Sequence, residues 1–194
     1  LHGYWCACGV MAGFSQGGGV GYALSNWMVE GDPGFDVWAM DVARYGDWAT
    51  LAYTNKKVQE NYSRRFSIRF PNEELPAGRP LRTTPVYDRL LAAGAQMGEA
   101  YGLEQALWFA PEGVVDDFSW RRSTDFAYVA EEANAVRAAV GMMEISSFAK
   151  YTIRGSGAPD WLDHLLASRL PVEGRMTLAP MLNHVGKLIG DFSL

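Results

Sequence analysis

Apolar residues recur at intervals of three and four positions in four stretches of the chain, and this spacing predicts amphipathic helices. The predicted helices cover residues 20–30, 86–101, 125–140 and 161–166. The second follows Thr84 and Pro85, an N-cap residue and a proline suited to the first turn, and Gly102 is placed to end it. Asp125 can cap the third helix in the same way.

Other stretches have the composition or alternation of strands. Residues 4–10 are compact and apolar, as in a buried strand, and residues 151–153 alternate between apolar and polar side chains. Two more strands are expected over residues 175–182 and 187–194, because residues 183–186 supply the Asn and Gly typical of a hairpin turn. Helices and strands together predict a mixed α+β or α/β fold.

A glycine-rich segment, residues 13–21, lies between the predicted strand 4–10 and the predicted helix 20–30. Such a loop at a helix start presents unpaired N–H groups and the positive end of the helix dipole, which suits a phosphate or the negative edge of a reduced flavin. Its spacing is not G-x-G-x-x-G, and no acidic residue follows where a ribose hydroxyl would need one, which argues against a nicotinamide dinucleotide. Alternatively, the glycines serve only to let the strand and helix pack closely.

Length and charge narrow the possibilities further. With 194 residues, of which 48% are hydrophobic, the chain can bury a core and form one domain or two small ones. It begins at Leu1, and residues 188–194 resemble a strand still in progress, so we expect a piece of a longer protein. The formal charge of -5 and the scattered Lys and Arg argue against a nucleic-acid partner. No apolar run has the length of a membrane span.

The cysteines and histidines do not form a metal-binding pattern. Cys6 and Cys8 lack the C-x-x-C spacing of zinc and redox sites and are too close for an ordinary structural disulfide, so we expect buried thiols. His2, His164 and His184 are widely separated in the chain. The sequence therefore predicts no metal site.

Several motifs occur in the order found in one family of flavoenzymes. They are G-F-S-Q-G-G-G-V-G at 13–21, W-A-M-D-V-A-R-Y at 38–45, G-R-P-L-R-T-T-P-V-Y-D at 78–88, V-G-M-M-E-I-S-S-F-A-K-Y at 140–151, M-L-N at 181–183 and G-D-F at 190–192. This collinear set resembles the dimethylglycine and sarcosine dehydrogenase family, in which an FAD-dependent oxidoreductase is fused to a folate-binding domain like the glycine cleavage T-protein, an aminomethyltransferase. The resemblance covers nearly the whole chain.

The resemblance implies three regions. Residues 1–50 would be the C-terminal part of the FAD-dependent oxidoreductase domain, residues 51–117 a central connecting region, and residues 118–194 the N-terminal part of the folate-binding domain. The expected fold is therefore a mixed one, made from the end of one domain, a connector and the start of another.

The resemblance also implies an activity and its cofactors. A methylated amino acid such as dimethylglycine or sarcosine would lose hydride to FAD, and tetrahydrofolate would capture the one-carbon unit. An electron-acceptor protein or a quinone-linked carrier is a further partner that the family suggests. The expected location is the cytoplasm in a bacterium or the mitochondrial matrix in a eukaryote.

Site residues are carried over from the matching motifs. On the flavin side they are Ser15, Gln16, Gly17, Gly18, Gly19 and Val20, and on the folate side Asn183 and Asp191. Asp191 matches the acidic position near the reactive nitrogens of folate, where it would orient the cofactor and handle protons. It could instead be a plain strand or turn residue, although strands disfavour Asp. Only one acid of the T-protein's usual pair is present, which weakens a claim to aminomethyl transfer.

Two alternatives remain beside the amine dehydrogenase. One is a folate-dependent aminomethyl or methyl transferase without redox chemistry, and the other is a non-catalytic relative such as the regulatory subunit of pyruvate dehydrogenase phosphatase. Arg79 and Arg82 could bind a substrate carboxylate, but the nearby Glu73, Glu74 and Asp88 favour structural ion pairs. Both arginines are therefore left outside the predicted site.

Overall fold

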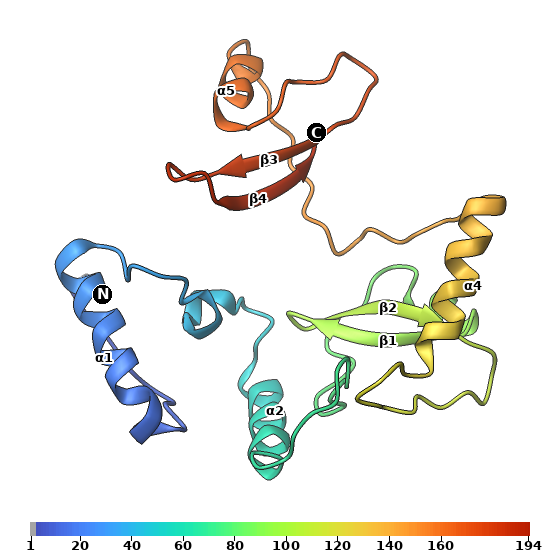
Figure 1. The fold of residues 1–194 in the computed structure, drawn as a ribbon, viewed down its shortest axis with the longest axis horizontal. Helices are drawn as coiled ribbons and strands as arrows, with labels where there is room; N and C mark the ends of the chain where they lie inside the picture. The colour runs from blue at the N-terminus through green and yellow to red at the C-terminus, as the bar shows by residue number, and fades with distance from the viewer. Residues whose placement is uncertain (1–2) are drawn as a thin grey trace. The chain divides into compact units, whose positions relative to one another are not determined.

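The computed structural model describes residues 3–194 and contains both helices and strands, as the mixed fold requires (Figure 1). The helices are α1 (Gly13–Glu30), α2 (Leu51–Ser63), α3 (Tyr87–Ala92), α4 (Asp125–Ala138) and α5 (Ala158–Leu165), with short 3-10 turns η1 (Trp38–Met40) and η2 (Val42–Arg44). The strands are β1 (Ala95–Ala100), β2 (Leu103–Phe109), β3 (Leu178–Leu182) and β4 (Leu188–Ser193). The chain separates into two compact units, one ending at Ser147 and one covering Phe148–Leu194, and each is described by itself.

The antiparallel hairpin β1–β2 is the centre of the first unit. Tyr101 and Gly102 join its strands, and both have positive φ values, 51° and 76°, as in the two-residue turns that match strand twist. The predicted helix over 86–101 is therefore wrong beyond Ala92, where α3 ends. Gly94, with φ 89°, turns the chain from α3 into β1, and a side chain there would collide with the carbonyl oxygen of Ala110.

Helix α4 packs against the β1–β2 hairpin, and Figure 1 shows it as the gold helix beside the two strands. Trp108 of β2 is only 5% exposed, and its ring stacks on Tyr128 of α4 at 5.6 Å between centroids. The Phe109 N–H donates a hydrogen bond of 2.9 Å to the Glu132 carboxylate. The helix predicted over 125–140 is confirmed as α4, which partly covers the hairpin through Tyr128 and Glu132.

Helix α1 begins earlier than the sequence pattern predicted. The glycine-rich segment is helical from Gly13 onward, so it forms the first half of α1 rather than a loop before it. The strand expected over residues 4–10 does not form, and Cys6 and Cys8 are exposed with their Sγ atoms 3.0 Å apart. The expectation of buried thiols is wrong here, because no described strand pairs with this segment and covers it.

Helix α2 lies at the start of residues 51–117, the stretch expected to form a connecting region. It begins after Thr50, whose hydroxyl oxygen accepts a hydrogen bond of 3.3 Å from the Tyr53 N–H. Across residues 3–194, none of the helices combines the length and hydrophobicity of a transmembrane segment.

The second unit consists of α5 and the hairpin β3–β4. Both predicted strands of this hairpin are confirmed, and Asn183 builds its turn by accepting hydrogen bonds from the N–H groups of Val185 and Lys187. Ala179 of β3 is fully buried, and the Ala167 N–H after α5 donates to the Pro180 carbonyl at 2.7 Å. The strand expected at residues 151–153 is absent, since that segment pairs with no described strand.

Candidate functional site

The flavin-side candidates lie together in the first two turns of α1. The Ser15 hydroxyl donates to the Ala12 carbonyl at 3.1 Å, and the backbone N–H groups of Ser15 and Gln16 donate to the same carbonyl. Ser15 therefore does not cap the helix with its side chain, and Ala12 at the N-cap position supplies no side-chain acceptor. The start of α1 is the positive end of its helix dipole, although the N–H groups of Ser15 and Gln16 are already bonded to Ala12.

The glycines among these candidates have a bare surface. No described heavy atom lies within 4 Å of a side-chain carbon placed at Gly17, Gly18 or Gly19. The alternative explanation, close strand–helix packing, therefore finds no packing partner within residues 3–194. The arrangement leaves a strip of helix backbone that another group can approach at van der Waals distance.

The folate-side candidates belong to the hairpin β3–β4. Asp191 lies in β4, opposite Pro180 of β3, and is exposed. Asn183 follows β3, and its side-chain oxygen already accepts the two N–H bonds that form the turn. Asn183 therefore has its amide nitrogen left to donate to a ligand, whereas the Asp191 carboxylate is open to donors. These two residues belong to the second unit and the α1 residues to the first, so the two groups of candidates are described separately.

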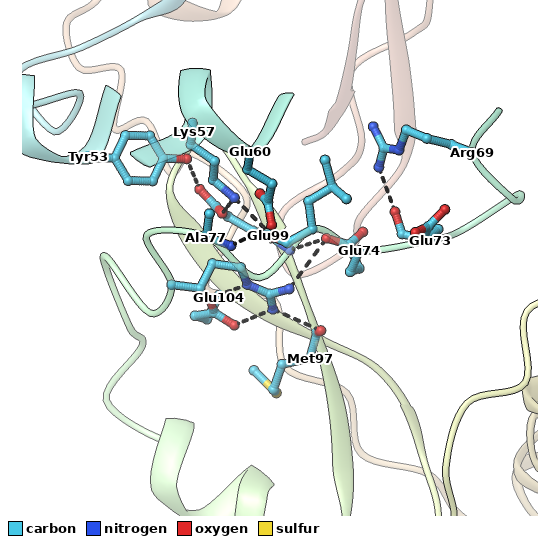
Figure 2. A network of polar contacts seen from close by, with 12 residues as sticks. Tyr53, Lys57, Glu60, Arg69, Glu73, Glu74, Ala77, Met97, Glu99 and Glu104 are labelled. Carbon is cyan, nitrogen blue, oxygen red and sulfur yellow. Dashed lines mark hydrogen bonds and ion pairs between the residues drawn. The ribbon is translucent and has the colours of Figure 1, made fainter. Parts of the chain in front are cut away.

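A network of charged residues in the first unit was largely missed by the sequence analysis (Figure 2). Arg79 makes two parallel hydrogen bonds to the Glu104 carboxylate, 2.8 Å from Nε to Oε1 and 2.7 Å from Nη2 to Oε2. Its Nη2 also donates to the Met97 carbonyl at 2.8 Å, and its Nη1 lies 3.6 Å from Glu74. The structural ion pair predicted for Arg79 is confirmed, although its main partner is Glu104.

Arg82 also has a structural contact. Its guanidinium donates a 2.7 Å hydrogen bond to the Tyr101 carbonyl and lies over the Trp48 ring at 5.5 Å. The acidic neighbours that the sequence suggested for it, Glu73 and Asp88, do not appear among its described contacts.

A second arm of the network joins α2 to the hairpin. The Tyr53 hydroxyl donates to one oxygen of Glu99, and the Lys57 ammonium lies 2.9 Å from the other. Burial, and then the hydrogen bond to Glu99, raise the pKa of Tyr53 well above its ordinary value, so Tyr53 stays protonated as the donor. The Glu99 N–H in turn donates to Glu74 at 3.2 Å.

An open cavity of about 1080 Å³ lies in the same region. Its walls include the aromatic rings of Tyr45, Trp48 and Tyr53 and the carboxylates of Glu74 and Glu99. Lys57 neutralises the Glu99 carboxylate, and Glu74 lies near Arg79 and accepts a hydrogen bond from the Glu99 N–H. The cavity is therefore nearly balanced in charge and lacks the excess acidity that would attract a cationic amine.

A smaller ion pair fixes the chain beside this network. Arg64 at the end of α2 pairs with the Glu73 carboxylate, which also accepts a 3.1 Å hydrogen bond from the Phe70 N–H. The bond from Arg64 holds the pKa of Glu73 below its ordinary value, with the Phe70 N–H adding to the effect. Arg69 then donates to the Glu73 carbonyl at 2.5 Å.

Metal ligands are not grouped in the part of the chain that the structure describes. No three His, Cys, Asp or Glu side chains among residues 3–194 come close enough to hold an ion.

Two family models match the chain in sequence order. The FAD dependent oxidoreductase central domain matches residues 30–84, and the GCVT N-terminal domain matches residues 86–194, which is more than half of the chain. The chain belongs to the GCVT N-terminal domain family. The two matches meet at residues 84–86, inside the stretch 51–117 that the sequence analysis assigned to a connector.

Individual relatives extend across both matched ranges. Dimethylglycine dehydrogenase of Rattus norvegicus is 35% identical over 98% of this GCVT-family chain, and sarcosine dehydrogenase of Homo sapiens is 29% identical over 100%. The pyruvate dehydrogenase phosphatase regulatory subunit of Mus musculus is 32% identical over 100%. All three are described as mitochondrial, and the chain covers 22% to 24% of their lengths. The resemblance found in the sequence motifs is confirmed.

Proposed function

We propose that this chain is part of an FAD-dependent amine dehydrogenase that oxidatively demethylates an N-methyl amino acid such as dimethylglycine or sarcosine. The observation that carries the proposal is the order of the two matches, an FAD oxidoreductase segment followed at once by a GCVT domain. Dimethylglycine dehydrogenase of Rattus norvegicus shares both segments at 35% identity. The one-carbon unit would pass to tetrahydrofolate, and the electrons would leave through an acceptor protein or quinone-linked carrier.

The bare face of α1 fits the flavin side of this reaction. Helix α1 contains five glycines, and each lowers helix stability by about 1 kcal/mol relative to alanine. Helix formation alone does not explain that cost, whereas close approach by a flat ring does. FAD, when bound, supplies hydride acceptance from the amine. The ring would lie against the bare backbone of Gly17, Gly18, Gly19 and Val20, and the side chains of Ser15 and Gln16 would contact its carbonyl edge.

The exposed carboxylate of Asp191 fits the folate side. It projects from β4 without an ordinary core role, and a carboxylate can accept hydrogen bonds from amino and ring N–H groups of a pterin. We assign it the orientation of folate and the removal of a proton during carbon capture. The Asn183 amide nitrogen, at the turn of the same hairpin, would add a donor.

Fusing the two modules has a physical purpose in this proposal. The oxidised amine is an electrophile that water converts to formaldehyde. A folate site on the same polypeptide meets it at a high effective concentration, so capture can compete with release. We retain residues 1–50 as the end of the flavin domain, 51–117 as connector and 118–194 as folate domain for this proposal. We place the enzyme in the mitochondrial matrix of a eukaryote or the cytoplasm of a bacterium.

The test uses the full-length protein. Its visible absorption is recorded anaerobically before and after addition of dimethylglycine, and then of sarcosine. Loss of the oxidised flavin band with one of them supports the proposal and identifies the substrate. A colourless protein that binds tetrahydrofolate would contradict it and favour a folate-dependent aminomethyl or methyl transferase.

A non-catalytic role is the second candidate, because the pyruvate dehydrogenase phosphatase regulatory subunit is 32% identical over the whole chain. The same experiment separates the two. A regulatory relative would leave the flavin band unchanged with both amines and would form no methylenetetrahydrofolate.

A further inference from the structure

Arg79 is a buried residue of one matched range, residues 30–84, and its main partner belongs to the other, residues 86–194. Its side chain is 13% exposed, and its main partner, Glu104, is 2% exposed. The fork-shaped contact between them gives both carboxylate oxygens a donor, the Met97 carbonyl accepts a further hydrogen bond from Nη2, and Nη1 lies 3.6 Å from Glu74. A buried carboxylate of this kind is stable only while its cation stays in place.

The contacts of this network cross from one matched range to the other. Tyr53 and Lys57 of α2, together with Glu74 and Arg79, lie in residues 30–84, which match the oxidoreductase central domain. Met97, Glu99 and Glu104 lie in the hairpin β1–β2, within residues 86–194. We call residues 73–84, which run between α2 and the hairpin, the strap.

Glu74 of the strap connects the two arms of the network. It lies 3.6 Å from Arg79 and accepts the 3.2 Å hydrogen bond from the Glu99 N–H. Lys57 also reaches two elements, since it pairs with Glu99 and donates to the Leu75 carbonyl at 3.1 Å. Figure 2 shows these side chains converging between α2, the strap and the hairpin. Movement of the strap away from the hairpin would separate the buried Arg79 from Glu104, and movement of α2 would separate the partly buried Lys57 from Glu99.

We propose that the Arg79 network is a latch that makes α2, the strap and the β1–β2 hairpin open and close as one cooperative unit across the junction of the two matched ranges. The unit behaves as one body even though its halves belong to different domain families. The latch is independent of the reaction assigned above, because it rests only on burial and contacts.

Amide hydrogen exchange on the full-length protein tests the latch. Arg79→Met keeps the aliphatic stem and removes the charge, which leaves Glu104 buried without its cation. We expect exchange to accelerate by at least about tenfold in α2, the strap and the hairpin, by a similar factor in each, with β3–β4 unchanged. Acceleration in the hairpin alone, or none at all, would overturn the proposal.

Three further variants serve as a conservative replacement, a control and an alternative to Arg79→Met. Arg79→Lys keeps the charge but loses the fork, so a smaller acceleration in the same three elements is expected. Arg121→Met removes an exposed arginine and should leave exchange unchanged in all of them. Should Arg79→Met yield no folded protein, Glu99→Gln weakens the Lys57 arm instead. It must then accelerate exchange in all three elements, and an effect limited to β1 counts against the latch.

Discussion

The two hairpins of this chain have the same secondary structure and different surroundings. The hairpin β1–β2 carries the buried Trp108 and Glu104, packs under α4 and joins the charged network through Arg79. In the hairpin β3–β4 the fully buried side chain is Ala179, and most of the other positions are exposed or half-buried. The candidate catalytic residue, Asp191, lies on this second hairpin.

The difference shows how one local structure can serve two purposes. An antiparallel pair alone is only marginally stable, so β1–β2 takes its rigidity from what covers it. The second hairpin has less cover and leaves most of its side chains exposed or half-buried. Under the proposed function, the covered hairpin supports the fold and the exposed one offers side chains to a ligand.

Trp108→Ala should produce the largest effect. It removes a buried ring stacked on Tyr128 and should cost the hairpin β1–β2 about 3–5 kcal/mol. Phe192→Ala in β4, a half-buried position, should cost about 1 kcal/mol or less. Amide exchange of both hairpins in the full-length protein measures the two costs. Equal costs would remove the distinction between the hairpins.

Gly102→Ala and Gly186→Ala compare the two turns directly. Both glycines have positive φ, 76° and 81°, so each substitution carries backbone strain of about 1 kcal/mol. A side-chain carbon at Gly102 would also lie 2.6 Å from the Trp48 ring, whereas one at Gly186 meets nothing within 4 Å. Gly102→Ala should lower the free energy of opening of β1–β2 by about 1–3 kcal/mol more than Gly186→Ala lowers that of β3–β4. The same exchange measurement checks this order.

Alkaline pH should affect the first unit through Tyr53. Its pKa in the folded protein is raised by burial and by Glu99, above the unfolded value of about 10. The stabilisation is therefore complete below about pH 10 and is lost as pH rises toward the folded pKa, because the unfolded chain releases its proton first. Tyr53→Phe should flatten the decline in melting temperature above about pH 10. The exposed Tyr151→Phe is the control, and an equal flattening by it would contradict the assignment.

Asp191→Asn should have the smallest effect on stability, within about 0.5 kcal/mol, because the side chain is exposed. Under the proposed function, it should still lower the yield of methylenetetrahydrofolate per flavin reduced by about a hundredfold or more, with free formaldehyde rising in proportion. Product analysis after anaerobic turnover measures this ratio. Asp163→Asn, an exposed acid of α5, is the matched control and should leave the ratio unchanged.

The sequence predicted β3–β4 correctly and β1–β2 wrongly for a shared physical reason. In the first case, an Asn and a Gly stood between two alternating stretches, which left a hairpin as the natural interpretation. In the second case, Met97 and Tyr101 continue the helical spacing of α3, so the pattern predicts one helix that ends at Gly102. A glycine with positive φ ends helices and closes hairpins alike, so the tertiary packing decides which it does.

The charged network shows that partners far apart in sequence are hard to predict. Glutamates near Arg79 in sequence were identified as partners, but Glu104 is 25 positions away and became a neighbour only through the hairpin. A two-residue turn at Tyr101 and Gly102 would have placed Glu99 opposite Glu104 and revealed two neighbouring acids that each need a cationic partner. The candidate ligand residues were located from family motifs, and their local contacts, such as the turn bonds of Asn183, required the structure.

The Arg79–Glu104 pair also bears on how such proteins can be recombined. A chimera that takes its GCVT segment from residue 86 onward, following the family match, would inherit Glu104 as a buried acid without Arg79. A transplant that starts before Leu51 would carry α2, the strap and the hairpin together. Chimeras between family members should therefore fold when the crossover point lies ahead of α2, and should fail to fold when it lies at the border of the two family matches. The segment that must be transferred intact is larger than the domain that the family match delimits.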